Sequence, residues 1–376
     1  CERCEDQHGG AGTRRRSLPR RVRPRARCER ATSETVVLVT LASLAACLGE
    51  PVVEAVACPG ATDQKLLTAD GATVALHHHP GQGPAVLLVH GIASNHRFWD
   101  LDADHSLAVW LAERGFDPWL LDLRGHGNAR MGLDQHPQVS GWTVDDYGLF
   151  DVPAAVTRVQ AITRQRRVAY VGHSMGGMVG AIYAASGGAR DLASLVLVAS
   201  PGAFSGDVDL IRMAKAGFDV GGTALLWFET GVAAEAAAAL GPLTPGQLQY
   251  RVYNPDNLDD DTEAALLRTV VSPISRDEMQ HFSRMMKHGR FESADGERDW
   301  LQAFGEVETP TLGIAGGADQ IGRPAWVRTL AEATGGPSAF VEVPGYGHVD
   351  LGLGEAADED VFPRILDWLQ RWATPG

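Results

Sequence analysis

The sequence has no excess of basic residues, and this limits the partners that it can bind. Its 33 lysines and arginines are outnumbered by 47 aspartates and glutamates, which gives a formal net charge of −14. A protein that binds the phosphates of nucleic acid needs a basic surface. We therefore expect no nucleic-acid partner, and we interpret the acidic balance as a source of solubility.

The N-terminal part also lacks an apolar run long enough to span a bilayer permanently. The run from Thr35 to Cys47 is short, but it follows an arginine-rich stretch, as in a secretory signal peptide. It ends in Leu44-Ala45-Ala46-Cys47, which resembles the lipobox of bacterial lipoproteins. We expect cleavage before Cys47, attachment of lipid to this cysteine, and a membrane-anchored protein of the bacterial cell envelope. Ordinary cleavage, which would give a free secreted or periplasmic enzyme, is the alternative.

The arginine-rich stretch, residues 1–30, has no apolar periodicity, so we do not expect it to fold alone. The chain begins with Cys1 and has no methionine before Met131, so we expect part of this stretch to lie upstream of the true start codon. A nucleic-acid-binding arm is the alternative interpretation of the arginines.

Cysteine is scarce, with five residues in the chain. Cys1, Cys4 and Cys28 would be removed with the signal peptide, and Cys47 would carry the lipid. Cys58 then has no partner, so we expect no intrachain disulfide even outside the cytoplasm. A competing cleavage site before Cys58 is weaker, because charged residues and a proline interrupt its apolar run.

From about residue 64, apolar strands alternate with helices. The continuous apolar run at 85–89 is typical of a strand that is buried on both faces. The alternation predicts an α/β fold with a mostly parallel sheet and helices on both faces. Strands are expected at 73–79, 85–89, 118–123, 167–171, 195–199, 311–315 and 339–343, and helices at 107–114, 144–164, 178–185, 325–333 and 361–372.

Residues 203–305 interrupt this alternation. Segments 210–218, 233–240 and 263–271 have helical spacing, and prolines separate them. We interpret 203–305 as a helical cap inserted into an α/β core. The domain prediction is therefore a leader and signal peptide at 1–46, a linker at 47–63, a core at 64–202 and 306–376, and the cap between the two core segments.

The motif Gly172-His173-Ser174-Met175-Gly176 lies between a predicted strand and a predicted helix. A nucleophile at such a tight turn sits in strained backbone, and flanking glycines avoid side-chain clashes. The N-terminus of the following helix offers free N–H groups to a developing oxyanion. We predict Ser174 as the nucleophile and the backbone N–H groups of Met175 and Ile92 as the oxyanion hole, because Ile92 follows the strand that ends in His90-Gly91.

The other two members of a catalytic triad are expected after the nucleophile. His348 lies on a glycine-bordered loop after the last predicted strand and is the candidate base. Asp319 follows the preceding strand and can hold the imidazole of His348 in the required tautomer. Asp207 and Asp209 are the alternative acids, and Asp350 is expected to support the loop of His348.

Three adjacent histidines, His77, His78 and His79, could suggest a metal site. Neighbouring side chains on a strand point to opposite faces of the sheet, so these three should not converge on one ion. We interpret them as residues of a polar strand edge, and we interpret His90 and His126 as structural turn residues. No metal and no organic cofactor is expected, because an acyl-enzyme mechanism uses side chains alone.

From about Leu87 to Trp372 the chain resembles α/β-hydrolases, and among them the acid lipases of the gastric and lysosomal type. The resemblance rests on Val89-His90-Gly91-Ile92-Ala93-Ser94, on Tyr147 with Asp151-Val152-Pro153-Ala154, on Tyr170-Val171-Gly172-His173-Ser174 and on Tyr346-Gly347-His348-Val349-Asp350. It implies hydrolysis of acyl-lipid esters beneath a helical cap. Met175 stands where these lipases usually have glutamine, a change that keeps the backbone donor.

These observations predict a serine esterase or lipase that acts on a small-molecule or lipid ester. An acyltransferase on the same fold and a catalytically inactive membrane-surface binding protein are the alternatives. The apolar residues of the cap should divide between packing against the sheet and lining an acyl pocket; those in question are Phe204, Leu225, Trp227, Phe228, Met285 and Met286.

Overall fold

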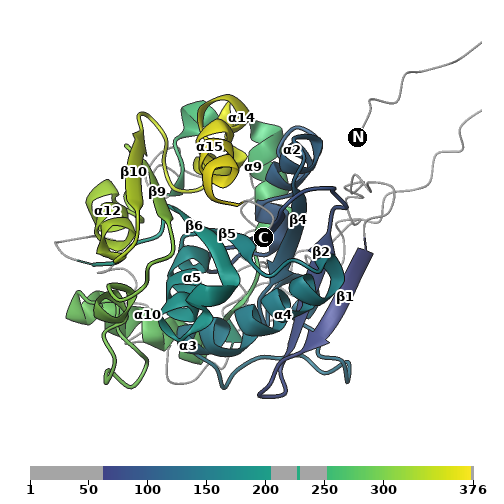
Figure 1. The fold of residues 1–376 in the computed structure, drawn as a ribbon, viewed down its shortest axis with the longest axis vertical. Helices are drawn as coiled ribbons and strands as arrows, with labels where there is room; N and C mark the ends of the chain where they lie inside the picture. The colour runs from purple at the N-terminus through teal and green to yellow at the C-terminus, as the bar shows by residue number, and fades with distance from the viewer. Residues whose placement is uncertain (1–61, 205–226, 229–251, 374–376) are drawn as a thin grey trace, which may run out of the picture. The chain divides into compact units, whose positions relative to one another are not determined.

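The computed structural model describes residues 62–204, 227–228 and 252–373, which belong to the compact unit Ala55–Gly376. Its main feature is an eight-stranded sheet with the order β1-β2-β4-β3-β5-β6-β9-β10 (Figure 1). The pairs β1–β2 and β2–β4 are antiparallel, and every later pair is parallel. The strands are β1 (Thr62–Leu67), β2 (Thr73–His78), β3 (Ala85–Val89), β4 (Asp117–Asp122), β5 (Val168–His173), β6 (Leu192–Val198), β9 (Thr311–Gly316) and β10 (Ser338–Val343).

Alternating side chains of each central strand fill two hydrophobic cores, one on each face of the sheet. In β3, Leu87 and Val89 belong to one core, and Val86 and Leu88 belong to the other. Helices α4 (Val152–Thr163), α5 (Met175–Ala185) and α12 (Pro324–Ala333) cover the first face. Helices α2 (Leu107–Glu113) and α15 (Phe362–Trp372) cover the second face, and Figure 1 shows α2 and α15 across the sheet from α4 and α5. The prediction of a mostly parallel, doubly covered sheet is confirmed.

The helix expected at 144–164 is divided into pieces. A short α3 (Val144–Asp146) leads into one turn of π-helix, Tyr147–Asp151, before α4 begins at Val152. Pro153 lies in the first turn of α4. Proline has no N–H to donate to the preceding turn, so the regular hydrogen-bond ladder is broken just before it.

Part of the predicted cap is described. It contains α9 (Asp260–Ala265), a π-helical turn at Leu266–Val270, a two-residue strand β8 (Ile274–Ser275) that pairs with β7 (Trp227–Phe228), then α10 (Arg276–His288) and α11 (Trp300–Phe304). The helices expected at 210–218 and 233–240 lie outside the described residues, and the domain boundaries stay predictions. In the part of the chain that the structure describes, no helix is long and apolar enough to cross a bilayer.

Candidate active site

Ser174 occupies the turn between β5 and α5 with φ 53° and ψ −119°, a left-handed conformation that is rare for residues with a side chain. The neighbouring glycines are required by close packing. A Cβ on Gly172 would lie 2.5 Å from the backbone of Gly176, and a Cβ on Gly176 would lie 2.4 Å from the carbonyl oxygen of His90. The motif thus folds into the tight strand-to-helix turn expected from the sequence.

The three predicted triad residues meet at this turn. The Nε2 atom of His348 lies 2.9 Å from the Oγ atom of Ser174, and its Nδ1 atom lies 2.8 Å from Oδ2 of Asp319. All three residues are buried, and the side chain of Asp319 is fully enclosed. A neutral imidazole that donates from Nδ1 to Asp319 leaves Nε2 free to accept the proton of the Ser174 hydroxyl.

The carboxylate of Asp319 is fixed by its own turn. Its Oδ1 atom accepts hydrogen bonds from the backbone N–H groups of Ile321 at 2.7 Å and Gly322 at 2.9 Å, which leaves Oδ2 for the histidine. The alternative acids, Asp207 and Asp209, lie outside the described residues.

The loop that carries His348 is held by the adjacent acid. Asp350 accepts hydrogen bonds from the backbone N–H of Gly347 at 2.8 Å and from the side-chain amide of Asn257 at 2.6 Å. Burial raises the pKa of Asp350, although these donors act in the opposite direction. Asp350 therefore supports the loop and makes no contact with the imidazole of His348 that would orient it.

The two predicted oxyanion donors, Ile92 and Met175, lie close to Ser174. Met175 is the first residue of α5, so its N–H has no acceptor within the helix. Ile92 and Ser174 line the same cavity. Gly91, the residue before Ile92, packs so closely that a Cβ there would be 3.0 Å from the Cβ of Ser174. The oxyanion role of Ile92 and Met175 stays a prediction.

A cavity of about 400 Å³ opens onto Ser174 and His348, and its walls are mainly apolar. One wall is the π-helical turn and the residues beside it. Another wall is formed by residues 91–94, the predicted oxyanion segment, and by Phe98. Its apolar lining residues include Ile92, Phe98, Val252, Leu266, Leu267, Val270, Val271, Ile321 and Val349. An ester with a hydrocarbon chain fits the chemistry of these walls.

The apolar residues singled out in the cap contribute differently. Phe204 and Met285 are buried in the core on the α5 face, and Met286 packs against that core. None of these three lines the cavity at Ser174. Trp227 and Phe228 are described as backbone of β7 alone, and Leu225 lies outside the described residues. The described wall instead comes from residues 266–271, which the sequence predicted as part of a helix without assigning them to a pocket.

His90 and His126 are buried behind the site. Burial lowers the pKa of His90 to about 3, so its ring is neutral, with Nδ1 donating to the carbonyl of Gly91 and Nε2 accepting from the N–H of Leu123. The Nε2 atom of His126 faces Oε1 of Glu278 at 3.7 Å, and neither atom has a hydrogen-bond partner among the described residues. Burial raises the pKa of Glu278, which favours the protonated form of its carboxyl group.

The histidines of residues 77–79 do not share a carboxylate, and His77 binds two, since its Nδ1 atom also lies 2.8 Å from Asp63. His77 lies 3.0 Å from Asp122, His78 lies 2.7 Å from Asp117, and His79 lies 2.8 Å from Asp100. They do not converge, as the alternation of side chains on a strand predicts. They do not form a polar edge either, because β1 covers β2 and the side chains of these histidines are largely buried.

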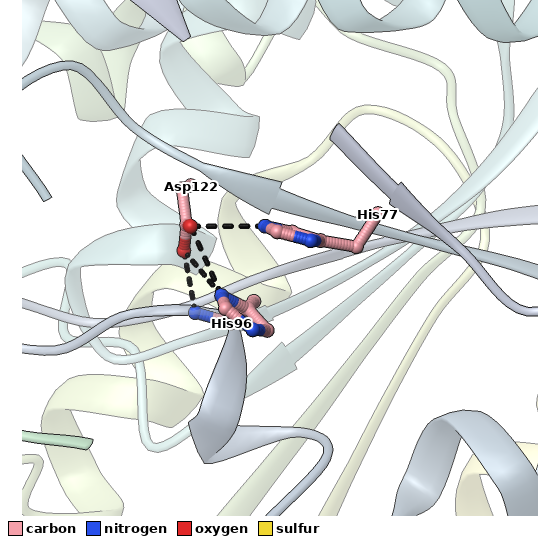
Figure 2. Close-up of side chains that lie close together, drawn as sticks. All are labelled: His77, His96 and Asp122. Carbon is pink, nitrogen blue, oxygen red and sulfur yellow. Dashed lines mark hydrogen bonds and ion pairs between the residues drawn. The ribbon is translucent and has the colours of Figure 1, made fainter. Parts of the chain in front are cut away.

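His77 comes together with a histidine that the sequence did not connect to it. His77, His96 and Asp122 bring three potential ligand atoms within 4.8 Å of one another (Figure 2). The Oδ2 atom of Asp122 accepts from both rings and from the N–H of Asn128. The two rings stack with centroids 3.7 Å apart and planes inclined by 24°. In-plane lone pairs of stacked rings run side by side, so this geometry suits two histidines that share Asp122 as a hydrogen-bond acceptor better than a metal site.

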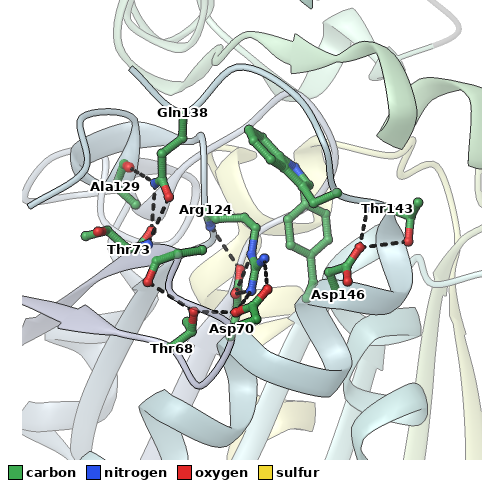
Figure 3. Close-up of polar contacts among 12 residues, drawn as sticks. Thr68, Asp70, Thr73, Arg124, Ala129, Gln138, Thr143 and Asp146 are labelled. Atoms are coloured by element: carbon green, nitrogen blue, oxygen red, sulfur yellow. Dashed lines mark hydrogen bonds and ion pairs between the residues drawn. The ribbon is translucent and has the colours of Figure 1, made fainter. Parts of the chain in front are cut away.

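A second buried network supports the loop after β4. Arg124 donates to Asp151 at 2.7 Å and to Asp70, in the β1–β2 turn, at 2.5 and 2.9 Å. Gln138 links the carbonyls of Ala129 and Thr73 in the same region (Figure 3). Asp151 belongs to the Asp-Val-Pro-Ala segment noted in the sequence, and the ion pair gives that segment a structural role.

The chain is similar in sequence to known lipases. The chain is 22% identical to human lipase member K over 364 residues, which cover 81% of this chain and 86% of the relative. It is 32% identical to human gastric triacylglycerol lipase over 133 residues, or 32% of this chain and 33% of that lipase.

Solved structures share the fold. A membrane phospholipase A, described as a bacterial virulence factor, superposes with a TM-score of 0.58 at 18% identity and covers 89% of this chain and 93% of its own. A thermophilic esterase from Thermogutta terrifontis gives a TM-score of 0.57 at 20% identity, covering 82% of this chain and 98% of the esterase.

The family model for the alpha/beta hydrolase fold matches residues 84–355, the span that contains β3, Ser174, Asp319 and His348. This span is well over half of the chain. Together with the sheet order and the strand-to-helix turn at Ser174, it shows that the chain belongs to the family of the alpha/beta hydrolase fold.

Proposed function

We propose that the chain is a serine hydrolase that cleaves carboxylic esters through an acyl-enzyme, with Ser174, His348 and Asp319 as its catalytic triad. The observation that carries the proposal is the continuous hydrogen-bonded series from Ser174 through His348 to Asp319, together with the largely apolar cavity that Ser174 and His348 line. The relatives named as lipases and the esterase of the same fold support the ester class.

In the proposed reaction, the Oγ atom of Ser174 attacks the ester carbonyl while its proton passes to Nε2 of His348. Asp319 stabilises the imidazolium that forms, and the N–H groups of Ile92 and Met175 stabilise the tetrahedral oxyanion. His348 then gives the proton to the leaving alcohol. A water molecule repeats the sequence on the acyl-enzyme and releases the acid.

The preferred substrate is an ester with a hydrocarbon acyl chain, such as a lipid ester. The cavity beside Ser174 is apolar on most of its walls, and burial of each methylene contributes about 0.8 kcal/mol. The triacylglycerol and lipase names of the relatives point to the same class.

The test uses p-nitrophenyl esters of increasing acyl length with the wild type and Ser174→Ala. A fluorophosphonate probe, followed by peptide mass analysis, reports which serine reacts. We expect labelling at Ser174, loss of hydrolysis in Ser174→Ala, and a preference for medium or long acyl chains. Turnover at the wild-type rate by folded, purified Ser174→Ala would reject the assignment.

We also propose that the mature protein is lipidated on Cys47 and held at a membrane of the bacterial cell envelope. The proposal is supported by the succession of arginines, a short apolar run and Leu44-Ala45-Ala46-Cys47. Several acyl chains together give firm attachment, whereas one chain binds only marginally. Expression of the wild type and Cys47→Ser in a bacterium, with fractionation and N-terminal mass analysis, tests it; an unmodified, soluble wild-type protein that begins at Cys47 is the contrary result.

A further inference from the structure

A second histidine lies beside Ser174 and is not part of the proposed triad. His173 is the last residue of β5, directly before Ser174, and its side chain is 3% exposed. Its Nε2 atom lies 3.0 Å from the backbone carbonyl oxygen of His348. A carbonyl oxygen only accepts hydrogen bonds, so Nε2 of His173 must carry the proton and donate it.

The ring of His173 is held in place by aromatic side chains. It stacks on Phe98 with centroids 4.0 Å apart and planes inclined by 20°, and it lies perpendicular to the ring of Trp99 with centroids 6.2 Å apart. Phe98 belongs to the short helix His96–Phe98, which follows the predicted oxyanion segment. The ring of His173 therefore touches both the oxyanion side of the site and the loop of the base.

Burial and two neighbouring histidine rings favour the neutral form of His173, whereas its hydrogen bond to the carbonyl of His348 acts to raise the pKa. Burial lowers its pKa well below the usual range, and the neighbouring rings of His348 and His90 act in the same direction. The centroid of the His348 ring is 4.7 Å away. A neutral His173 adds no positive charge beside the imidazolium that His348 becomes during the proposed reaction.

We propose that His173 is a positioning residue, which fixes the base loop relative to the nucleophile by donating from Nε2 to the carbonyl of His348; this rests on the proposed roles of Ser174 and His348. The peptide groups around His348 are then held on two sides, since its N–H donates to the carbonyl of Val252 at 3.1 Å. Misplacement of a catalytic group by about 1 Å can cost 100-fold in rate, so such a contact bears directly on turnover.

Two matched variants separate this role from simple packing. His173→Phe keeps a ring that can stack on Phe98 but has no donor. His173→Gln loses the ring but places an amide N–H at a reach similar to that of Nε2. We expect kcat for His173→Phe to fall by about 10- to 100-fold with KM little changed, and we expect His173→Gln to recover most of the loss. If His173 acted only by packing, His173→Phe would keep a higher kcat than His173→Gln.

The rate at which the fluorophosphonate labels Ser174 should follow the same order, and this measurement needs no knowledge of the natural ester. Wild-type kcat in folded His173→Phe, or equal loss in both variants, would overturn the proposal. If neither variant folds, nitrogen NMR of the wild type tests the hydrogen bond itself. The proposal requires a neutral His173 ring with its proton on Nε2, and a proton on Nδ1 alone would overturn it.

Ser174→Ala is run alongside to keep the two proposals apart. If Ser174→Ala remains active, the proposed function fails whatever His173 does. If Ser174 is essential and His173→Phe is fully active, only the positioning role fails.

Discussion

The carbonyl oxygen of Val252 accepts a hydrogen bond from the backbone N–H of His348 at 3.1 Å, and a second from that of Val349 at 3.0 Å. Val252 belongs to the segment between β6 and β9, whereas His348 follows β10. The position of His348, the proposed base, is thus set partly by a segment that precedes it by about a hundred residues, and not by its own loop alone.

The segment that follows Val252 leaves no room for a side chain on Gly347, the residue before His348. A Cβ on Gly347 would lie 2.9 Å from the backbone of Tyr253 and Asn254. Gly347→Ala should therefore displace the loop of His348 and lower kcat by about 10-fold or more. Gly345→Ala is the matched control, because Gly345 has φ +79° but open space around its missing Cβ. Equal kcat losses in both variants would show that any disturbance of this loop, and not the clash at Gly347, lowers kcat.

Asp319→Asn should reduce kcat by about 10,000-fold while KM and the fold are retained. An amide beside Nδ1 can donate to that atom, which stabilises the wrong tautomer of His348 and leaves Nε2 unable to accept the serine proton. Steady-state kinetics and circular dichroism of the purified variant measure this. Asp207→Asn and Asp209→Asn are the comparison, and a larger loss in either would transfer the role of the acid to that residue.

Leu267→Trp should shorten the acyl chain that the enzyme prefers. Leu267 lines the cavity beside Ser174, and an indole there would fill space otherwise open to substrate. Each methylene that is excluded should cost about 0.8 kcal/mol, or roughly fourfold in kcat/KM, for long esters only. Leu133→Trp, at a residue that is 50% exposed and does not line the cavity, is the control. If kcat/KM depended on acyl length in the same way in the two variants, the acyl chain would not bind beside Leu267.

The His77–His96–Asp122 cluster should make folding stability depend on pH. Burial lowers the pKa of His77, but Asp122 and Asp63 outweigh it, so the pKa is raised in the folded protein. The stability that His77 contributes through its raised pKa is complete below about pH 6.5, the pKa of an unfolded histidine. It is lost as the pH rises through the pKa of His77 in the folded protein. Burial would raise the pKa of Asp122, but His96 and His77 outweigh it and hold this pKa well below the usual range. The stability that Asp122 contributes is therefore lost as the pH falls through that lowered pKa.

His77→Gln keeps a donor to Asp122 but cannot gain the charge. Thermal melts between pH 5 and 9 should show that the wild type loses Tm with rising pH faster than His77→Gln does. A difference of 1 kcal/mol corresponds to about 2–4 °C in a domain of 150–250 residues, and to somewhat less here. The exposed His136, replaced by Gln, provides the control. Identical slopes for the wild type and His77→Gln would exclude the cluster as the source.

The sequence was informative wherever one local pattern decides the structure. The apolar run 85–89 coincides with β3, because a strand buried on both faces tolerates no polar residue. Ser174 and His348 could be predicted as site residues because glycine-bordered turns mark their backbone, and the structure brings their side chains within 2.9 Å. Helix α10 was missed because its residues are mostly polar, although the capping box formed by Ser275 and Glu278 was a usable signal.

Contacts between distant segments could not be predicted in this way. The pairing of His77 with His96 depends on how β2 and the helix His96–Phe98 meet, and the bond from His173 to the carbonyl of His348 joins residues 175 positions apart. Periodicity and local motifs carry no information on such encounters. The division of cap residues between core and cavity was beyond the sequence for the same reason.

The left-handed backbone of Ser174 has a consequence for how this protein could be improved. Such a conformation costs a residue with a Cβ about 1–3 kcal/mol, whereas glycine adopts it freely. Ser174→Gly should therefore melt at a higher temperature than Ser174→Ala, although alanine is the more stabilising of the two in most helices and strands. Selection for heat resistance alone would then favour loss of Ser174, the proposed nucleophile, so any programme of thermostabilisation must screen for turnover at every round.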